Sequence, residues 1–241
     1  MKIGIIQSRG LGDLIIALPI AWNYHQDGHE VYWPICEEFM SSMTKAAPWV
    51  NWIPLKTDHH GNFFYFHAYG NLKYRELDEI ICLYQYLSNM PELSDPTLFP
   101  ILKFDQYKYA KVGMALKDKL RLPECIVRDP AAEALLKEQV IVKDRYIVAH
   151  LEGSDRRVDL DFSDVDPAVQ VVEIRPGFTD NIFDWLGVLE GAESMYMIDS
   201  CFSNLVDAYD LCRDKWFIRR SKMDLTPVLL SDWQYFPVDS R

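Results

Sequence analysis

Residues 2–35 read KIGIIQSRGLGDLIIALPIAWNYHQDGHEVYWPI, and this stretch decides the fold. Lys2–Gln7 is a short apolar run typical of a strand, and Ser8–Gly12 is a turn that contains glycine. Asp13–Gln26 carries apolar residues at helical spacing, and His29–Ile35 predicts the next strand. Two strands joined by one helix form a right-handed unit with parallel strands, so the chain opens as an α/β protein.

Two prolines and a glycine refine this prediction. Pro19 lies inside the predicted helix and should bend it, whereas Gly28 follows the helix and should end it. Pro34 has no N–H to donate to a neighbouring strand. It therefore predicts that His29–Ile35 is an edge strand or ends early.

The middle of the chain is less regular. Asn51–Leu55 is a strand candidate, and Asp78–Leu83 is either a strand or a helix that continues through Tyr86, because periodicity alone does not decide. Tyr107–Lys119 predicts a lysine-rich helix. Asp129 and Pro130 suit the cap and first turn of a helix that reaches about Gln139.

Strands and helices alternate again after Lys143. The expected elements are the strands Arg145–Leu151, Ala168–Ile174, Ser194–Ile198 and Lys215–Arg219 and the helices Phe178–Gly191 and Asp199–Leu211. Alternation that occurs twice, with an interruption near residues 120–143, predicts two Rossmann-like parallel-sheet domains that face a cleft. Ligands of such sheets bind at the carboxyl ends of the strands.

The expected domains are residues 1–140 on the acceptor side, residues 141–225 on the donor side, and a tail of residues 226–241. The tail contains Trp233, Tyr235 and Phe236, which is too much aromatic surface to leave in water. We expect it to pack back on the first domain.

Composition limits the class of protein. The 241 residues include 25 Lys and Arg against 36 Asp and Glu, which gives a net charge of −11 and argues against binding polyanions through bulk charge. The five cysteines form no C-x-x-C pair and indicate reduced thiols of a cytoplasmic protein. The N-terminus lacks the long apolar core of a signal peptide, and no apolar run is long enough for a membrane span.

Asp13 is the first candidate for chemistry. Ile15 occupies the position of the third glycine of a dinucleotide fingerprint, so GLGD is a different kind of turn, and a P-loop lysine is also absent. The dipole of the following helix stabilises an ionised Asp13 carboxylate, which could accept a proton from a hydroxyl. Spacing alone favours the commoner role of a helix N-cap.

A second candidate site follows two strands of the second half. Glu173 ends one strand, and Asp199-Ser200 ends another and opens a helix. The Ser200 hydroxyl and the N–H groups after it could hold a diphosphate, and Glu173 could accept hydrogen bonds from ribose hydroxyls. A helix cap is the alternative for Asp199-Ser200.

Four short blocks resemble one family. GLGDLIIALP at 10–19, VVEIRPG at 171–177, LEGAE at 189–193 and MIDSCFSNL at 197–205 resemble the ADP-heptose:lipopolysaccharide heptosyltransferases. These are glycosyltransferases with a compact, two-domain GT-B fold. The resemblance implies metal-independent transfer of a sugar from a nucleotide-diphosphate sugar, with inversion, and no cofactor besides that substrate.

The resemblance also implies roles for particular residues. Asp13 would be the general base, and Glu173 would contact the donor nucleoside. Arg156 or Arg157 would stabilise the leaving diphosphate. The remaining donor-binding residues would be Gly12, Ser154, Asp199, Ser200 and Asn204, and the acceptor-side residues would be Arg9, Gly10, His67 and Tyr69.

The chain departs from the family pattern at two positions. Cys201 stands where the family has glycine, and Asn204 stands where it has histidine. Together with the short chain, this indicates a trimmed enzyme for another sugar, similar to bacteriophage transferases that modify hydroxymethylated bases in DNA. We expect the acceptor to be either a glycan, such as lipopolysaccharide core, or such a DNA base.

If the acceptor is DNA, two segments are where we expect it to bind. One is the aromatic segment Phe63–Tyr69, and the other is the basic stretch Lys108, Lys111, Lys117, Lys119 and Arg121. As a charge run, the basic stretch is more typical of a solvated face.

Other functions stay open at this point. The chain could be a nucleotide-binding module without activity, or a metal-dependent transferase that uses Asp159 and Asp161. Acidic runs of this kind are more often solvated. His59, His60 and His67 match no zinc-ligand spacing, and His150 is more typical of a core histidine with its hydrogen bonds made.

Overall fold

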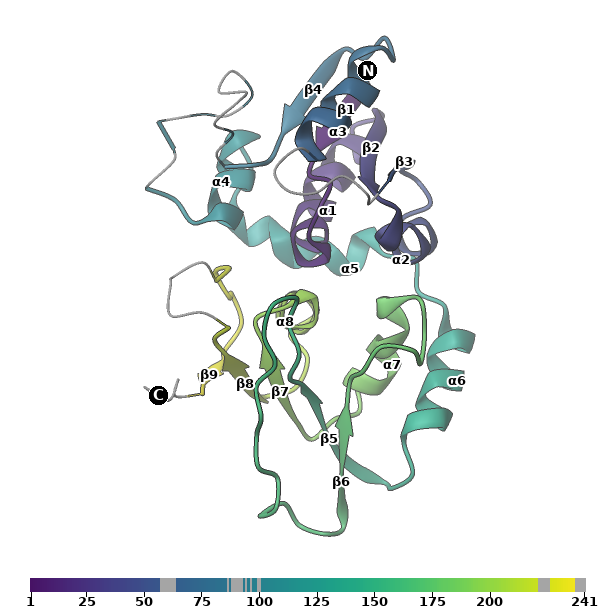
Figure 1. Ribbon diagram of the computed structural model, residues 1–241, viewed down its shortest axis with the longest axis vertical. Helices are drawn as coiled ribbons and strands as arrows, with labels where there is room; N and C mark the ends of the chain where they lie inside the picture. Colours follow the sequence, from purple (N-terminus) through teal and green to yellow (C-terminus); the bar gives the residue numbers. More distant parts are fainter. Residues whose placement is uncertain are drawn as a thin grey trace. The chain divides into compact units, whose positions relative to one another are not determined.

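The computed structural model describes residues 1–56, 64–85, 87, 93, 95, 97–98, 101–220 and 226–236. The chain divides into two compact units, Met1–Val127 and Arg128–Arg241 (Figure 1). Each unit has its own parallel sheet with helices packed on it, so the predicted α/β class with two parallel-sheet domains is confirmed.

The sheet described in the first unit has the strand order β3-β2-β1-β4, and every pairing in it is parallel. Its strands are β1 (Lys2–Ile6), β2 (Glu30–Cys36), β3 (Asn51–Leu55) and β4 (Glu79–Cys82). The α-helices are α1 (Leu11–Gln26), α2 (Met40–Ala46), α3 (Phe64–Lys73), α4 (Phe104–Lys111) and α5 (Leu122–Cys125). Short 3-10 helices are η1 (Glu37–Phe39) and η3 (Leu116–Arg121).

The core of the first unit forms around α1. Every residue from Leu14 to Ala21 is buried, because the helix packs on β2, α4, η3 and α5. The helix continues through Pro19. It begins two residues earlier than the predicted Asp13–Gln26, since Gly10 adopts a φ of 83° and ends the loop there.

Pro34 is not on an edge strand, which corrects the prediction. β2 lies inside the sheet between β1 and β3. The Cys36 N–H donates to Ser8 O, so the Pro34 nitrogen, two residues earlier, faces β1. Regular pairing of β1 with β2 ends at Gly4 and Tyr32, before the missing donor. The proline therefore shortens the ladder of hydrogen bonds between β1 and β2, which both lie inside the sheet.

The sheet described in the second unit has the strand order β6-β5-β7-β8-β9, again all parallel. Its strands are β5 (Arg145–His150), β6 (Val169–Glu173), β7 (Ser194–Ile198), β8 (Asp214–Ile218) and β9 (Gln234–Tyr235). The helices are α6 (Pro130–Val140), η4 (Ile182–Trp185), α7 (Leu186–Leu189) and α8 (Cys201–Ala208). The helix predicted from Phe178 starts only at Ile182, because the Asn181 side chain caps it there.

The division between the units falls after Val127, earlier than the predicted Val140. The Asp129 carboxylate caps α6 as expected, by accepting from the N–H groups of the next turn. Arg128 pairs with Glu133 on α6 and with Glu190 beyond α7. These contacts, together with the packing of α6 on α7, place α6 in the second unit.

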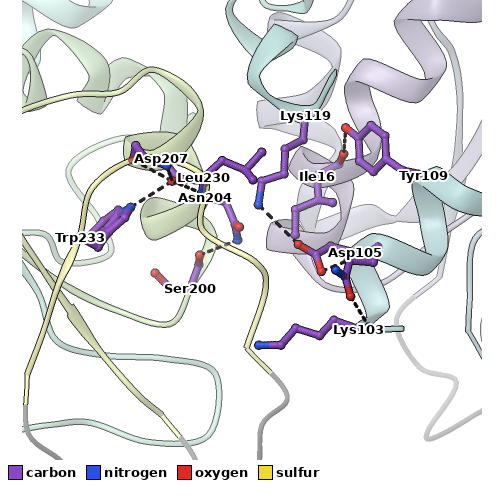
Figure 2. A network of polar contacts seen from close by, with 12 residues as sticks. Ile16, Lys103, Asp105, Tyr109, Lys119, Ser200, Asn204, Asp207, Leu230 and Trp233 are labelled. Atoms are coloured by element: carbon purple, nitrogen blue, oxygen red, sulfur yellow. Dashed lines mark hydrogen bonds and ion pairs between the residues drawn. The ribbon is translucent and has the colours of Figure 1, made fainter. Parts of the chain in front are cut away.

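The described part of the C-terminal tail belongs to the second unit, which corrects the expectation that it packs on the first. β9 pairs with β8 at Phe217 and Tyr235, and Trp233 packs on Phe217. The buried Asp207 carboxylate of α8 accepts a hydrogen bond from the Trp233 indole at 3.0 Å (Figure 2). Edge pairing and this buried acceptor hold the tail where it is.

The lysine-rich helix is also different from its prediction. α4 ends at Lys111, and Gly113 has a φ of 71° before η3 begins. Lys108 and Lys119 are buried, so the basic stretch is not one solvated face.

The five cysteines are free thiols. Among the helices described, none combines the length and the apolar character needed to cross a membrane.

Candidate functional site

The loop between β1 and α1, residues 7–10, is held by hydrogen bonds on both sides. The Trp33 indole donates to Gln7 O at 2.8 Å, and the Gln7 side-chain amide donates to Arg9 O at 3.0 Å. The N–H groups of Ser8 and Arg9 both donate to the Tyr84 hydroxyl, at 3.1 and 3.3 Å. Burial raises the Tyr84 pKa, which keeps the phenol protonated. The protein's own hydrogen bonds therefore fix the loop.

Asp13 lies in the first turn of α1, and the structure decides its local role. Gly10 is the N-cap residue and makes no side-chain cap, so Asp13 is not the helix cap that spacing favoured. One carboxylate oxygen, Oδ1, lies 3.0 Å from Lys108 Nζ, and the Asp13 side chain is 35% exposed. A Cβ on Gly10 would lie 2.7 Å from the other oxygen, Oδ2, so glycine is required there.

Lys108 was predicted only as part of the basic stretch, and the structure instead pairs it with Asp13. Its side chain is 3% exposed and comes from α4. Besides Asp13, the ammonium donates to Gln7 Oε1 at 2.7 Å and to Leu83 O at 3.2 Å. A buried ion pair was not visible in the sequence, because the two residues are far apart along the chain and the lysine lies in a charge run.

The other acceptor-side residues are placed as follows. Arg9 is exposed in the loop beside Asp13. His67 and Tyr69 are half-buried on α3, where Tyr69 packs against the core cluster and Lys73 lies 5.9 Å from its ring. The predicted aromatic segment is thus helical from Phe64. Its start, like the pair His59-His60, lies outside the described residues.

In the second unit, a tight hairpin follows β5. Gly153 N donates to Arg156 O at 2.7 Å, which brings Ser154 and Arg156 close to the end of β8. Arg220 donates to Ser154 Oγ at 2.9 Å and accepts from the Arg156 guanidinium at its carbonyl, 3.3 Å away. It also pairs with Asp155 at 3.3 Å. Arg220 was missed, although it follows directly after a predicted strand.

Glu173 ends β6 and binds two arginines. Its Oε1 pairs with Arg157 at 2.7 Å and its Oε2 with Arg175 at 2.5 Å. These guanidinium groups lower the Glu173 pKa, so the carboxylate is ionised at neutral pH. Glu173, the residue predicted to bind ribose, therefore pairs with Arg157, one of the residues predicted to bind the diphosphate.

Ser200 caps α8, as its alternative reading predicted. Its Oγ accepts from Phe202 N at 3.2 Å and lies 2.9 Å from His150 Nδ1. Burial lowers the His150 pKa to about 4, so the imidazole is neutral. Asp199, the residue before the cap, is buried and continues the pairing of β7 with Ile218.

The two departures from the family pattern lie on the first turn of α8. The Asn204 amide donates to Ser200 O at 2.9 Å (Figure 2), and among the described residues its Oδ1 is a buried oxygen without a hydrogen bond. Burial raises the Cys201 pKa to about 12, so this residue is a neutral thiol. Asn204 thus uses one N–H donor within α8 and keeps a buried acceptor oxygen without a hydrogen bond.

The acidic loop was a metal-site candidate. The Asp159 side chain is 97% exposed and lies 3.7 Å from Arg157, and Asp161 accepts from Ser163 N at 2.9 Å. Over the part of the chain that the structure describes, no group of three or more His, Cys, Asp or Glu side chains could hold a metal ion.

Solved structures with this fold cover almost the whole chain. The E. coli heptosyltransferase WaaC, solved with ADP-2-deoxy-2-fluoro heptose, matches with a TM-score of 0.53 and 14% identity, over 98% of this chain and 93% of that one. The fold is that of the heptosyltransferases. A family 9 glycosyl transferase from Veillonella parvula has a similar fold. It matches with a TM-score of 0.58 and 10% identity, over 98% of this chain and 86% of that one.

A third structure is longer than this chain. The dodecameric iron-containing heptosyltransferase TibC, in complex with ADP-D-beta-D-heptose, matches with a TM-score of 0.57 and 10% identity, over 100% of this chain and 63% of that one. No family model and no curated protein sequence matches the chain. The heptosyltransferase fold confirms the predicted GT-B architecture.

Proposed function

We propose that this protein is a glycosyltransferase that moves a sugar from a nucleotide-diphosphate sugar to an acceptor hydroxyl. The observation that carries the proposal is the match of the heptosyltransferase fold along 98% of the chain. Asp13 supports it, since a carboxylate at the carboxyl end of β1 lies where parallel sheets bind ligands.

The second unit offers the groups that a nucleotide diphosphate needs. The N-terminus of α8 supplies backbone N–H groups, and the arginines that follow β5, β6 and β8 supply positive charge. These arginines are Arg156, Arg157, Arg175 and Arg220. In this proposal the arginines neutralise the diphosphate without a metal ion once it replaces the carboxylates of Glu173 and Asp155 as their partner. Glu173 exchanges an arginine for ribose hydroxyls when the donor binds.

Asp13 of the first unit is the general base in this proposal. It takes the proton of the acceptor hydroxyl while the hydroxyl oxygen forms a bond to the anomeric carbon. The bond from that carbon to the diphosphate oxygen breaks, and the nucleoside diphosphate leaves with the electron pair. One displacement without a protein nucleophile inverts the anomeric configuration.

A glycan is the acceptor that charge favours. The chain has a net charge of −11, and the burial of Lys108 and Lys119 removes two cations from the basic stretch that would have held DNA. Affinity for nucleic acid depends mainly on cations that reach the phosphates. A hydroxymethylated DNA base is the alternative acceptor, and the transfer assay should test it beside the glycan.

Thermal unfolding with added nucleoside diphosphates is the direct test. WaaC and TibC were solved with adenine nucleotides, so ADP and ADP sugars come first, with and without EDTA. We expect one diphosphate to raise the melting temperature regardless of EDTA. Arg157→Ala should lose this shift. Arg145→Ala removes a surface arginine at the opposite end of β5 and should keep it.

Transfer is then measured with the stabilising donor on core oligosaccharide and on hydroxymethylated DNA side by side. Sugar transfer to either acceptor supports the proposal and identifies the acceptor class. Binding of a diphosphate without transfer or hydrolysis would mean a nucleotide-binding module instead. No shift with any diphosphate would contradict the donor site itself.

A further inference from the structure

The environment of the Lys108 ammonium leaves it no donor for a ligand. Lysine carries three N–H donors, and three acceptors surround Nζ: Asp13 Oδ1 at 3.0 Å, Gln7 Oε1 at 2.7 Å and Leu83 O at 3.2 Å. The Phe104 ring lies 5.4 Å away. All donors of this buried group are therefore used inside the protein.

These acceptors come from three different parts of the first unit. Gln7 follows β1, Leu83 follows β4 and Asp13 belongs to α1, whereas Lys108 belongs to α4. The NH2 group of the same Gln7 side chain donates a hydrogen bond to Arg9 O at 3.0 Å. One ammonium thus fixes both the Asp13 carboxylate and the loop that leads to it.

The helix that carries Lys108 is itself anchored to α1. The hydroxyl of Tyr109, the next residue, donates to Ile16 O at 2.9 Å (Figure 2). Tyr109 is buried, so α4 and α1 keep a fixed relation at this point. The distance from Lys108 to Asp13 is therefore set by the packing of two helices.

We propose that Lys108 is the positioning residue for Asp13 and that it selects the oxygen that takes the proton. Lys108 holds Oδ1, which leaves Oδ2, beside the bare Cα of Gly10, for the acceptor hydroxyl. The proton goes to Oδ2, and no bond to Lys108 forms or breaks. This inference rests on the proposed function of Asp13 as general base.

The test compares Lys108→Met with Lys119→Met by steady-state kinetics. Lys119 is a matched control, because it is also buried in the first unit but pairs with Asp105 at 3.5 Å. We expect Lys108→Met to lower kcat by about 100-fold, as misplacing a catalytic group does, with the donor KM within about three-fold. Lys119→Met should keep kcat within about three-fold of wild type.

A double variant separates positioning from general damage. When Asp13→Asn is already present, adding Lys108→Met should lower kcat by less than about three-fold, because the residue that Lys108 positions is gone. A full 100-fold further loss would mean that Lys108 acts elsewhere. Wild-type kcat in a folded Lys108→Met would overturn the inference directly.

Lys108→Arg covers the case in which Lys108→Met does not fold. It keeps the positive charge, but a planar guanidinium cannot reach the same three acceptors. We expect kcat to fall by at least about ten-fold with the donor KM unchanged. Wild-type kcat in this variant would overturn the inference. A wild-type protein that transfers no sugar would instead overturn the proposed function, and this inference with it.

Discussion

The Ser200 hydroxyl and His150 Nδ1 are 2.9 Å apart and share a hydrogen bond. The same Ser200 oxygen also accepts from the N–H of Phe202 in the first turn of α8. Burial lowers the His150 pKa to about 4, so the imidazole is neutral at pH 7. A residue that the sequence indicated as an ordinary core histidine thus sets the orientation of the α8 cap.

Acid should weaken the second unit through His150. Burial lowers its pKa from 6.5 to about 4 in the folded protein, so the unfolded chain binds the proton first as pH falls. Stability is full above pH 6.5 and is lost toward pH 4, by roughly 2 kcal/mol between pH 7 and pH 5. Urea unfolding at both pH values measures this. His150→Gln should reduce the loss, and an unchanged loss would contradict the assignment.

Asp13→Asn should abolish turnover without removing the donor. The amide keeps the shape but takes up no proton, so we expect kcat to fall by about 1,000-fold. The affinity for the nucleoside diphosphate, measured by calorimetry, should stay within a few-fold. A loss of donor binding would show that Asp13 is structural.

Gly10→Ala should disturb Asp13, whereas Gly28→Ala should not. Both glycines have a φ above 80°, so alanine costs each about 1 kcal/mol of stability. Only at Gly10 would the new Cβ lie 2.7 Å from Asp13 Oδ2, whereas nothing lies within 4 Å at Gly28. We expect similar melting temperatures for the two variants and a lower kcat for Gly10→Ala alone. Equal kcat values would mean that the close contact is harmless.

Asp207→Asn should loosen the tail. The buried carboxylate accepts from the N–H groups of Leu230 and Ser231, from the Ser231 hydroxyl and from the Trp233 indole. An amide would replace an acceptor by a donor that meets other donors, at a cost of about 3 kcal/mol. Trp233→Phe removes one donor only and should cost less. Urea unfolding ranks the two variants, and the reverse order would contradict this account.

Glu173→Ala should weaken donor binding by about ten-fold if the carboxylate binds ribose hydroxyls. The same change frees Arg157 and Arg175 from their shared partner. Calorimetry with the nucleoside diphosphate distinguishes the two effects. Tighter binding in the variant would show that Glu173 restrains the arginines and does not contact the nucleoside.

Local signals predicted the regular elements well. Asn51–Leu55 and Ser194–Ile198 are strands with the predicted bounds, and Asp129 caps α6 as expected. These features depend on side-chain alternation and on hydrogen bonds within one turn. Such interactions join residues that are close in the sequence, and they are visible there.

Contacts between residues far apart in the chain could not be predicted from the sequence. Pro34 indicated an edge strand or an early end, yet β2 lies inside the sheet, because β3 supplies a further neighbour, and only its pairing with β1 ends early. The aromatic residues of the tail correctly indicated that it is buried, but the predicted partner, the first domain, was wrong: the described part of the tail packs on the edge of β8 and on the Asp207 carboxylate. Hydrophobicity requires burial without saying against what.

The sequence by itself determined two α/β units with parallel sheets, most of the strands in each, and Asp13, Glu173 and Ser200 at the ends of strands. Only the tertiary structure decided that Lys108 is buried against Asp13, that Glu173 holds two arginines and that His150 shares a hydrogen bond with Ser200. The physical reason is that charge and hydrogen-bond partners are chosen by distance in space, which a pattern along the chain does not contain.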